Sequence, residues 1–382
     1  MKLFHLSDLH IGKQLHHYNL REDQEHILRE VIDYAKELHP DAIMIAGDIY
    51  DKSVPSAEAV AVFDDFLTEL SLIEPVIPIL MIAGNHDSAQ RLDYASRILG
   101  HHNIHIAGNP PETREQKIKK VTLTDEHGEI DFYLLPFLKP GYVRNVFDEP
   151  AESYSDAVLK LIAREQIDWK RRNVLISHQF YIGNGQTPKT CDSENISVGG
   201  IDQVDIDGVK QFDYVALGHL HGAQKVFMEN IRYCGTLLKY SVSESGQEKS
   251  LHVISLGEKG EEISVEKLPL HPLRDVRKLR GKLTDLIEEA LPENRDDYVS
   301  ITLTDEVDPY KPKEQLEKVY SHILEIRVDN TRTRQRLEDF QEEITLAGPL
   351  EIFGDFYKEI QGKELSSEEQ ALILDILEEI GE

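Results

Sequence analysis

The chain has 382 residues, of which 40% are hydrophobic and 29% are charged, and its net charge is −28. This length predicts two or three domains, and the lack of ~20 consecutive apolar residues excludes a membrane-spanning helix. Two cysteines, Cys191 and Cys234, exclude a disulfide framework and favour a reducing cytoplasm. The acidity argues against DNA binding, which rests on Lys and Arg, but it is uneven: 14 acidic residues and two lysines lie between Glu338 and Glu382.

Strand and helix signals alternate over the first 200 or so residues. Apolar side chains at helical spacing indicate helices at 21–38, 56–70 and 88–99; in the second of these, Val60, Phe63 and Leu67 are aligned. This alternation predicts an α/β layered core, and a strand-rich later section suggests two sheets packed face to face. Apolar runs indicate strands at 3–6, 42–46, 78–83, 131–135, 173–177, 214–217, 224–241, 251–256 and 263–268.

A boundary is expected at His271-Pro272, which separates a domain of residues 1–270 from a smaller one of residues 271–331. The smaller domain has the signals of an α+β capping module, with strands at 275–279, 298–304 and 324–328 and helices at 283–291 and 313–323. Residues 332–382 then form an acidic helical tail. Its last helix begins at a capping box of Ser366 and Glu369.

That last helix carries an apolar stripe, which a folded helix must bury against something. We interpret the tail as a docking element for a partner protein. The alternative is that the stripe folds back on the capping module. The stripe consists of Leu372, Ile373, Ile376, Leu377 and Ile380.

Five short polar motifs each follow an apolar strand. Since ligands gather at the carboxyl ends of strands in layered α/β folds, we expect these loops to converge on one site. Asp, Asn and His supply oxygen and nitrogen ligands suited to Mn²⁺, Fe²⁺ or Zn²⁺. Residues spaced like Asp8 and His10 are expected to lie on the same side of an extended segment. The motifs are Asp8-Leu9-His10, Gly47-Asp48-Ile49-Tyr50-Asp51, Gly84-Asn85-His86-Asp87, Ser177-His178 and Gly218-His219-Leu220-His221.

A single histidine after a strand is more often a loop or core residue than a metal ligand. For the histidines that stand outside the motifs, that interpretation suffices; these are His16, His17, His101, His102 and His105. Five segments in this order, each after a strand, instead indicate a metal centre.

Together the motifs resemble the pattern of the calcineurin-like metallophosphoesterases, which is D-x-H, G-D-x-x-D, G-N-H-[DE], H and G-H-x-H. The resemblance implies a β-sandwich flanked by helices, with two divalent metal ions bridged by one carboxylate, that of Asp48. By this carry-over, one metal would be held by Asp8, His10, Asp48 and His221, and the other by Asp48, Asn85, His178 and His219.

Two such ions would grip a scissile phosphate and lower the pKa of a bound water. The leaving oxygen needs a proton or charge stabilisation, for which His86 is the candidate because it lies next to Asn85. In relatives with this pattern the acid of G-D-x-x-D orients that histidine, which implies that Asp51 is its partner. The alternative for Asp51 is a helix-capping or solvated role.

Longer segments are similar to SbcD proteins, a bacterial family of DNA double-strand-break-repair nucleases. These segments are residues 2–13, 47–51, 54–59, 82–88 and 213–221, within a resemblance that runs from Met1 to about Ser241. It implies a homodimer with an SMC-like ATPase, SbcC, as partner, in the cytoplasm and associated with the nucleoid. It also implies Mn²⁺-dependent exonuclease and endonuclease action on DNA ends and hairpins in repair, recombination and replication. The second histidine that some members carry near the position of Asp51 is missing here.

The helices at 56–70 and 88–99 are candidates for the dimer interface, with ordinary core packing as the alternative. Candidate DNA contacts near the site are Lys13, His16, His17 and Arg91, and further ones are Lys170, Arg171, Arg172, Arg277 and Arg280. For these side chains the alternative is solvated surface.

Two other functions remain open. A phosphatase or cyclic-nucleotide phosphodiesterase for small substrates would use the same motifs, but it needs neither the capping module nor the acidic tail after His271. A non-catalytic scaffold on this fold would typically lose ligands or the proton donor, and none is missing from this sequence.

Overall fold

The computed structural model describes residues 1–183, 185–194, 200–334 and 349–380. It divides into two units. The first comprises Met1–Lys278 with Asp296–Tyr298, and the second comprises Leu279–Arg295 with Val299–Glu382.

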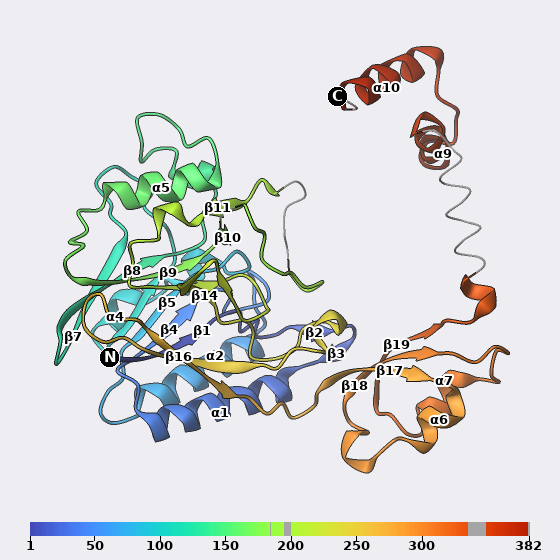
Figure 1. Cartoon of the computed structure of the whole chain (residues 1–382), viewed down its shortest axis with the longest axis horizontal. Helices are drawn as coiled ribbons and strands as arrows, with labels where there is room; N and C mark the ends of the chain where they lie inside the picture. Colours follow the sequence, from blue (N-terminus) through green and yellow to red (C-terminus); the bar gives the residue numbers. More distant parts are fainter. Residues whose placement is uncertain (184, 195–199, 335–348, 381–382) are drawn as a thin grey trace. The chain divides into compact units, whose positions relative to one another are not determined.

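Two six-stranded sheets form the centre of the first unit (Figure 1). The first has the order β16-β15-β1-β4-β5-β6, in which β1, β4, β5 and β6 are parallel. Its strands are β1 (Lys2–Leu6), β4 (Ala42–Ala46), β5 (Ile79–Ile82), β6 (Ile104–Ala107), β15 (Ser250–Ser255) and β16 (Ser264–Pro269). The second has the order β13-β14-β12-β9-β8-β7. Its strands are β7 (Lys119–Asp125), β8 (Gly128–Leu135), β9 (Arg172–His178), β12 (Tyr214–Gly218), β13 (Gln224–Val226) and β14 (Met228–Tyr233).

The two sheets pack face to face through one apolar core. Met44 and Leu80 of the first sheet belong to the same buried cluster as Phe132, Val174 and Ile176 of the second. Burial of side chains from both inner faces is what holds such a sandwich together, because each sheet alone would expose an apolar face. The predicted α/β layered sandwich is therefore confirmed.

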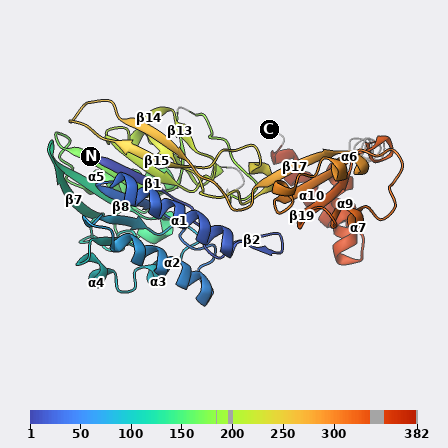
Figure 2. The ribbon, with the colours of Figure 1, turned by 90° about the horizontal axis from the view of Figure 1, so that it is seen from below.

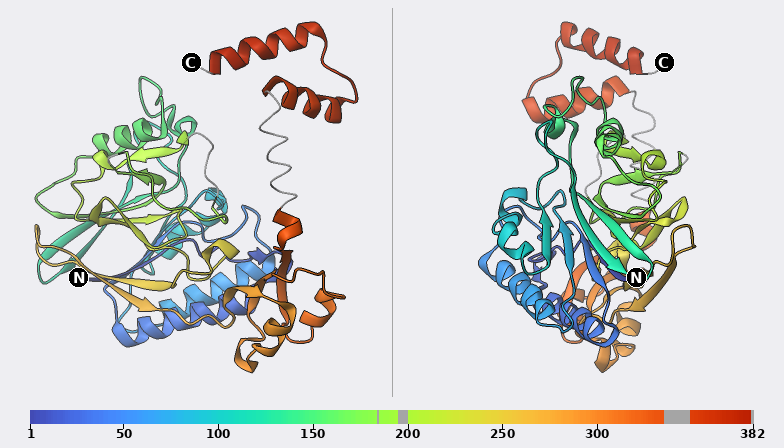
Figure 3. Two further views of the ribbon diagram at one scale, coloured as in Figure 1. Left: turned by 45° about the vertical axis from the view of Figure 1, so that its right-hand side comes forward. Right: turned by 90° about the vertical axis from the view of Figure 1, so that its left-hand side faces the viewer.

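Helices cover the outer faces of the sandwich. α1 (Arg21–Leu38) and α2 (Ala57–Ser71) lie side by side on the first sheet (Figures 2 and 3), and α5 (Tyr154–Arg164) covers the second. The bounds predicted for α1 are confirmed. In α2, the Ser56 side chain caps the helix by accepting from the Ala59 N–H (3.2 Å), as N-cap serines do. Val60, expected on the buried face, is 44% exposed, because the buried stripe of α2 includes Ala59, Phe63, Phe66 and Leu70.

Two predicted elements are wrong in extent. The helix expected at 88–99 is divided into α3 (Ala89–Leu92) and α4 (Ser96–Gly100), because Ala95 takes a left-handed conformation (φ 59°) that a right-handed helix cannot pass through. The strand expected at 224–241 is the pair β13 and β14 and ends at Tyr233. Three further elements, β6, α5 and β7, were not predicted, although Val121 and Leu123 alternate with polar residues in β7.

The second unit contains a small core around the three-stranded sheet β17-β18-β19. Leu286 of α6 and Leu316 of α7 pack in this core with Val299 and Ile301. The helix predicted at 313–323 ends at Leu316, so it is shorter than expected. The elements are β17 (Val276–Gly281), α6 (Leu283–Glu288), β18 (Tyr298–Leu303), α7 (Pro312–Leu316) and β19 (His322–Val328).

The tail contains α9 (Pro349–Gln361) and α10 (Ser367–Ile380). The predicted capping box is confirmed: the Ser366 N–H donates to Glu369 Oε2 (2.8 Å) and the Glu369 N–H donates to Ser366 Oγ (3.3 Å). Of the predicted stripe, Leu372 is exposed, and the side chains of Ile376, Leu377 and Ile380 lie outside the described residues. Among the described helices, none is long and apolar enough to span a membrane.

A buried histidine away from the polar motifs makes stability depend on pH. His252 of β15 is fully buried, and within the described part of the chain neither ring nitrogen has a hydrogen-bond partner. Burial, with smaller contributions from Lys267 and Arg232, lowers its pKa from 6.5 to about 3. Because the folded-state pKa lies below the unfolded-state value, the stability that His252 contributes is present above pH 6.5 and is lost as the pH falls.

We therefore expect His252→Leu to flatten the acid limb of the stability curve. Between pH 6.5 and pH 4.5, the free energy of unfolding of the parent should fall faster than that of the variant by about 1.4 kcal/mol per pH unit. Denaturant unfolding with a chelator at several pH values measures this difference, with the exposed His102→Leu as matched control. Equal pH dependence of parent and His252→Leu would refute the assignment.

Candidate metal centre

Loops from both sheets meet at one edge of the sandwich. Asp8 follows β1, Asp48 follows β4 and Asn85 follows β5 in the first sheet, whereas His178 ends β9 and His219 follows β12 in the second. Parallel pairing of β1 with β4, of β4 with β5 and of β9 with β12 places these carboxyl ends next to one another. The structure thus brings all the predicted ligand residues into one region.

The backbone of this region is unusual. Asp8 (φ 53°), His10 (φ 43°), Asp48 (φ 51°) and His219 (φ 104°) all have positive φ angles. The expectation that the ligand pairs lie on extended segments is therefore wrong, because the chain turns sharply at each strand end to aim these side chains. Non-glycine residues in this conformation cost on the order of 1 kcal/mol each and are concentrated at functional sites.

Two motif glycines allow the loops to approach one another closely. A side chain at Gly84 would overlap the Asp48 carboxylate, and one at Gly218 would overlap the backbone oxygen of Ala46. The loops are also tied together by the Asp8 N–H, which donates to Gly47 O (2.9 Å), and by the His10 N–H, which donates to Asp48 O (3.0 Å). The glycines of the motifs are thus explained by packing at the site.

Asp8, His10 and His221 form a first group of buried ligand atoms, all within 4.8 Å of one another. The Nε2 atoms of His10 and His221 are 3.1 Å apart. Both carboxylate oxygens of Asp8 accept from the backbone N–H of His219, at 3.0 and 3.1 Å. This group converges as ligands of one ion do.

Asp48, Asn85, His178 and His219 form a second group beside the first. His178 Nε2 lies 3.3 Å from Asp48 Oδ2 and 3.1 Å from Asn85 Oδ1. His219 Nδ1 lies 2.9 Å from the same Asn85 oxygen. His178 Nδ1 donates to the backbone oxygen of Ala46 (2.7 Å), so Nε2 is the nitrogen available to bind a metal ion.

Asp48 faces both groups. Its Oδ2 atom lies 3.7 Å from His10 Nε2 in the first group and 3.3 Å from His178 Nε2 in the second. Its Oδ1 atom accepts from the backbone N–H of His86 (2.8 Å), which holds the carboxylate in place. One carboxylate between two sets of nitrogen and oxygen atoms is the arrangement of a bridging ligand.

Burial and neighbouring charges shift the pKa values of the ligand candidates. Burial opposes ionisation of Asp48, but His178 and His10 hold the pKa of its carboxyl well below the ordinary range. Burial tends to lower the pKa of His178, but the Asp48 carboxylate raises it to about 9. Burial, followed by the charge of His178, lowers the pKa of His219 to about 3. An ionised carboxylate among buried imidazoles and an amide oxygen is a donor set that fits a divalent cation.

His86 lies beside this cluster and is half-buried. Its ring packs edge-on against His10 with centroids 4.8 Å apart, and its Nδ1 donates to the backbone oxygen of Asp51 (2.8 Å). The Asp51 carboxylate accepts from Lys13 Nζ (2.8 Å) and lies 3.7 Å from His10 Nδ1. The observed hydrogen bond from His86 thus goes to the main chain of Asp51, where a side-chain contact was expected.

Asp87 ends the third motif, and no role was predicted for it. Its Oδ2 accepts from the N–H groups of Ile49 (3.1 Å) and Gly84 (2.9 Å), and its Oδ1 from that of Tyr50 (3.0 Å). Asp87 therefore fixes the loop that carries Asp48 to the loop that carries Asn85. Burial and the nearby Asp48 charge raise its pKa to about 6.

The candidate DNA contacts have different surroundings. Lys13 is paired with Asp51, His16 and His17 are exposed where β2 (Gln14–Leu15) meets β3 (Tyr18–Asn19), and Arg91 is exposed on α3. Arg172 is wrong as a DNA contact, because it is 2% exposed and its guanidinium donates to Asp125 (2.9 and 2.5 Å).

Comparisons with known proteins agree with these motifs. The calcineurin-like phosphoesterase family matches residues 1–223, and the type 5 capsule protein repressor C-terminal domain matches residues 272–361. The chain is 32% identical to SbcD of the nuclease SbcCD from Staphylococcus epidermidis over 372 residues, 96% of this chain and 95% of that protein.

Solved structures offer more distant likenesses. GAP50, the anchor in the inner membrane complex of Plasmodium, is 13% identical with a TM-score of 0.41, covering 71% of this chain and 89% of that one. A dimetal phosphatase from Danio rerio is 12% identical with a TM-score of 0.42, covering 70% of this chain and 95% of that one.

Proposed function

Because the chain belongs to the calcineurin-like phosphoesterase family, and within it to the SbcD family, we propose that it is a DNA nuclease that hydrolyses phosphodiester bonds with two divalent metal ions. The observation that carries the two-metal assignment is the position of Asp48 Oδ2, close to imidazole nitrogens of both ligand groups. One ion would be held by Asp8, His10, Asp48 and His221, and the other by Asp48, Asn85, His178 and His219.

When bound, the ions supply positive charge to the scissile phosphate and acidify the attacking water. The donor set has no thiolate and suits Mn²⁺. His86 would protonate the leaving oxygen. Since a carbonyl oxygen only accepts, the bond to Asp51 O keeps a proton on His86 Nδ1, and the proton for transfer is the one on Nε2.

The proposed substrate is DNA, at ends and hairpins, with an SbcC-like ATPase of the SMC family as partner in repair, recombination and replication. The support is similarity to SbcD over nearly the whole of both chains, including the region after residue 272. We assign residues 1–270 to the nuclease domain, 271–331 to a capping domain and 332–382 to a docking tail.

The decisive experiment incubates the purified protein and Mn²⁺ with a DNA hairpin and with a chromogenic phosphodiester, with and without the ATPase. A nuclease should cleave the hairpin, and the ATPase should change the rate. Hydrolysis of the small diester without any cleavage of DNA under either condition would instead favour a phosphodiesterase for small substrates.

We also propose that the protein is a homodimer that uses α2 and the α3–α4 segment. Val60 of α2, Tyr94 between the two short helices and Ile98 of α4 are apolar and exposed, and such side chains are common at protein interfaces. Light scattering of the purified protein measures its mass in solution.

We expect a chain that ends at Arg334 to retain Mn²⁺-dependent cleavage of short DNA and to lose association with the ATPase. The reason is that all the candidate ligands lie between Asp8 and His221, whereas Leu372 of the tail is exposed and apolar. Cleavage assays and co-purification with the ATPase measure the two effects. A truncated protein that unfolds at a clearly lower temperature yet still binds the ATPase would show that the tail is structural.

A further inference from the structure

The metal ligand candidate His221 is hydrogen-bonded, on the side away from His10, to a chain of polar groups that ends at the buried Glu244. Its Nδ1 atom lies 2.6 Å from Ser193 Oγ, and that hydroxyl lies 2.6 Å from Glu244 Oε1. The opposite ring nitrogen, Nε2, faces His10. Neither Ser193 nor Glu244 belongs to the five polar motifs.

Glu244 is fully buried and has several donors around it. Its Oε2 accepts from Lys249 Nζ (2.6 Å), and its Oε1 accepts from Ser241 Oγ (3.0 Å) as well as from Ser193. The Lys249 ammonium and the two serine hydroxyls all donate to Glu244, so its carboxylate acts as an acceptor.

The proton positions follow from these acceptors. A serine hydroxyl has one proton, and the carboxylate of Glu244 takes it, so a lone pair of Ser193 Oγ is turned toward His221. The short contact between Ser193 Oγ and His221 Nδ1 then requires the proton on Nδ1. A neutral imidazole with its proton on Nδ1 has its free lone pair on Nε2, on the side of the metal centre.

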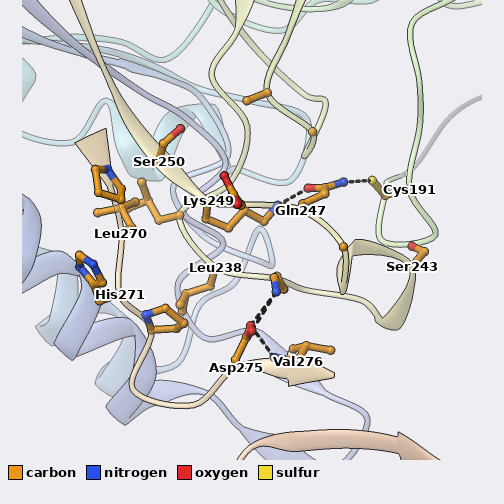
Figure 4. A pocket seen from close by; sticks show the side chains of 18 of the residues that line it. Cys191, Leu238, Ser243, Gln247, Lys249, Ser250, Leu270, His271, Asp275 and Val276 are labelled. Carbon is orange, nitrogen blue, oxygen red and sulfur yellow. Dashed lines mark hydrogen bonds and ion pairs between the residues drawn. The ribbon is translucent and has the colours of Figure 1, made fainter. Parts of the chain in front are cut away.

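Further hydrogen bonds fix the rest of this assembly. Lys249 Nζ also donates to the backbone oxygen of His221 (2.9 Å) and to Gln247 Oε1 (2.7 Å). The backbone N–H of His221 donates to Glu194 Oε1 (2.6 Å). Figure 4 shows Lys249 and Gln247 at the wall of an adjoining cavity of about 910 Å³, with Gln247 reaching Cys191. The main chain and the ring of His221 are thus held together.

We propose that Ser193 and Glu244, anchored by Lys249, are positioning residues that hold the proton on His221 Nδ1 and direct Nε2 to a divalent metal ion. This inference rests on the proposed function, since it takes His221 to be a metal ligand. It assigns a role to two residues that lie far from the ligand motifs in sequence.

Glu244→Gln tests the proton arrangement with little change in shape. The amide oxygen should remain on Lys249, which only donates, so the amide NH₂ should face Ser193. The Ser193 hydroxyl would then donate to His221 Nδ1, and the proton of His221 would move to Nε2, where it blocks metal binding. Ser193→Ala removes the partner of Nδ1 altogether, whereas Ser193→Thr keeps a hydroxyl and should preserve binding.

The experiment measures Mn²⁺ binding to chelator-stripped, full-length protein by titration calorimetry, together with thermal unfolding of the metal-free forms. The parent should bind two ions. Ser193→Ala and Glu244→Gln should weaken one of the two binding events by about 10–100-fold, as loss of a ligand's hydrogen-bond partner does, and should leave the other event intact. Ser193→Thr should restore parent affinity, and Glu248→Gln, an exposed residue of the same cavity wall, should match the parent.

Parent affinity in Ser193→Ala, or equal weakening in Ser193→Ala and Ser193→Thr, would overturn the inference. If Glu244→Gln does not fold, the two serine variants still decide. A parent protein that binds no divalent ion would instead refute the proposed function itself, so the two failures are distinguishable.

Discussion

Asp48→Ala should lose both metal ions, and DNA hydrolysis should fall by about 10³-fold or more, because the metals supply several kcal/mol of transition-state stabilisation. Asp48 Oδ2 lies 3.7 Å from His10 Nε2 of one ligand group and 3.3 Å from His178 Nε2 of the other, whereas Asp8 Oδ1 lies 4.0 Å from His178 Nε2. Removing Asp48 also leaves the raised pKa of His178 without its main cause, so that imidazole returns toward neutrality.

Elemental analysis after gel filtration gives the number of ions per chain, and cleavage of a DNA hairpin gives the rate. Asp48→Asn keeps the shape of the side chain and separates loss of charge from loss of packing. Asp64→Asn, at an exposed position of α2, is the matched control. Two tightly bound ions in Asp48→Ala would mean that the bridge is assigned wrongly.

The ligand cluster was predictable because it follows from strand ends. Asp8, Asp48, Asn85, His178 and His219 each come directly after an apolar run, and parallel pairing places such positions at one edge whatever the details of the loops. The pattern of apolar residues also predicted the sandwich and the bounds of α1, whose apolar residues recur at helical spacing along its whole length.

The orientations of these side chains were not predictable from the spacing of the motif residues in the sequence. Asp8 and His10 have left-handed backbone conformations, which tertiary contacts impose and which local propensity disfavours. The sequence also could not show whether His86 bonds to the backbone carbonyl or to the carboxylate of Asp51, because tertiary contacts decide this too. Such details depend on where two loops touch.

Residues that act through another residue leave little signal in one sequence. Ser193 and Glu244 are 28 and 23 residues away from His221, and each is an ordinary polar residue in its own segment. Arg172 was wrongly predicted to be a DNA contact. A Lys-Arg-Arg run has the composition of a solvated surface, yet this side chain is buried against Asp125. The roles of Glu244 and Arg172 both depend on their burial, which the sequence alone does not show.

His86→Ala should keep both metals and lower kcat for DNA by about 10²–10⁴-fold, the usual contribution of general acid catalysis. Alanine keeps the backbone N–H that donates to Asp48 Oδ1 (2.8 Å), so the bridging carboxylate remains held. The imidazole itself is half-buried beside His10. It clusters with His10 and Asp51 but is not one of the residues proposed to hold either ion, so its loss should affect proton transfer to the leaving alkoxide.

The choice of substrate makes this prediction specific. A DNA strand leaves as an alkoxide, which needs a proton, whereas a nitrophenyl diester leaves as a stable phenolate, which does not. His86→Ala should therefore lose far more activity on DNA than on the nitrophenyl diester, with metal content equal to that of the parent and of the exposed-histidine control His102→Ala. A general acid is needed in proportion to the basicity of the leaving group, so equal losses on the two substrates would mean that His86 acts in charge stabilisation or substrate positioning. Near-parent cleavage of DNA would show that His86 has no role in the mechanism.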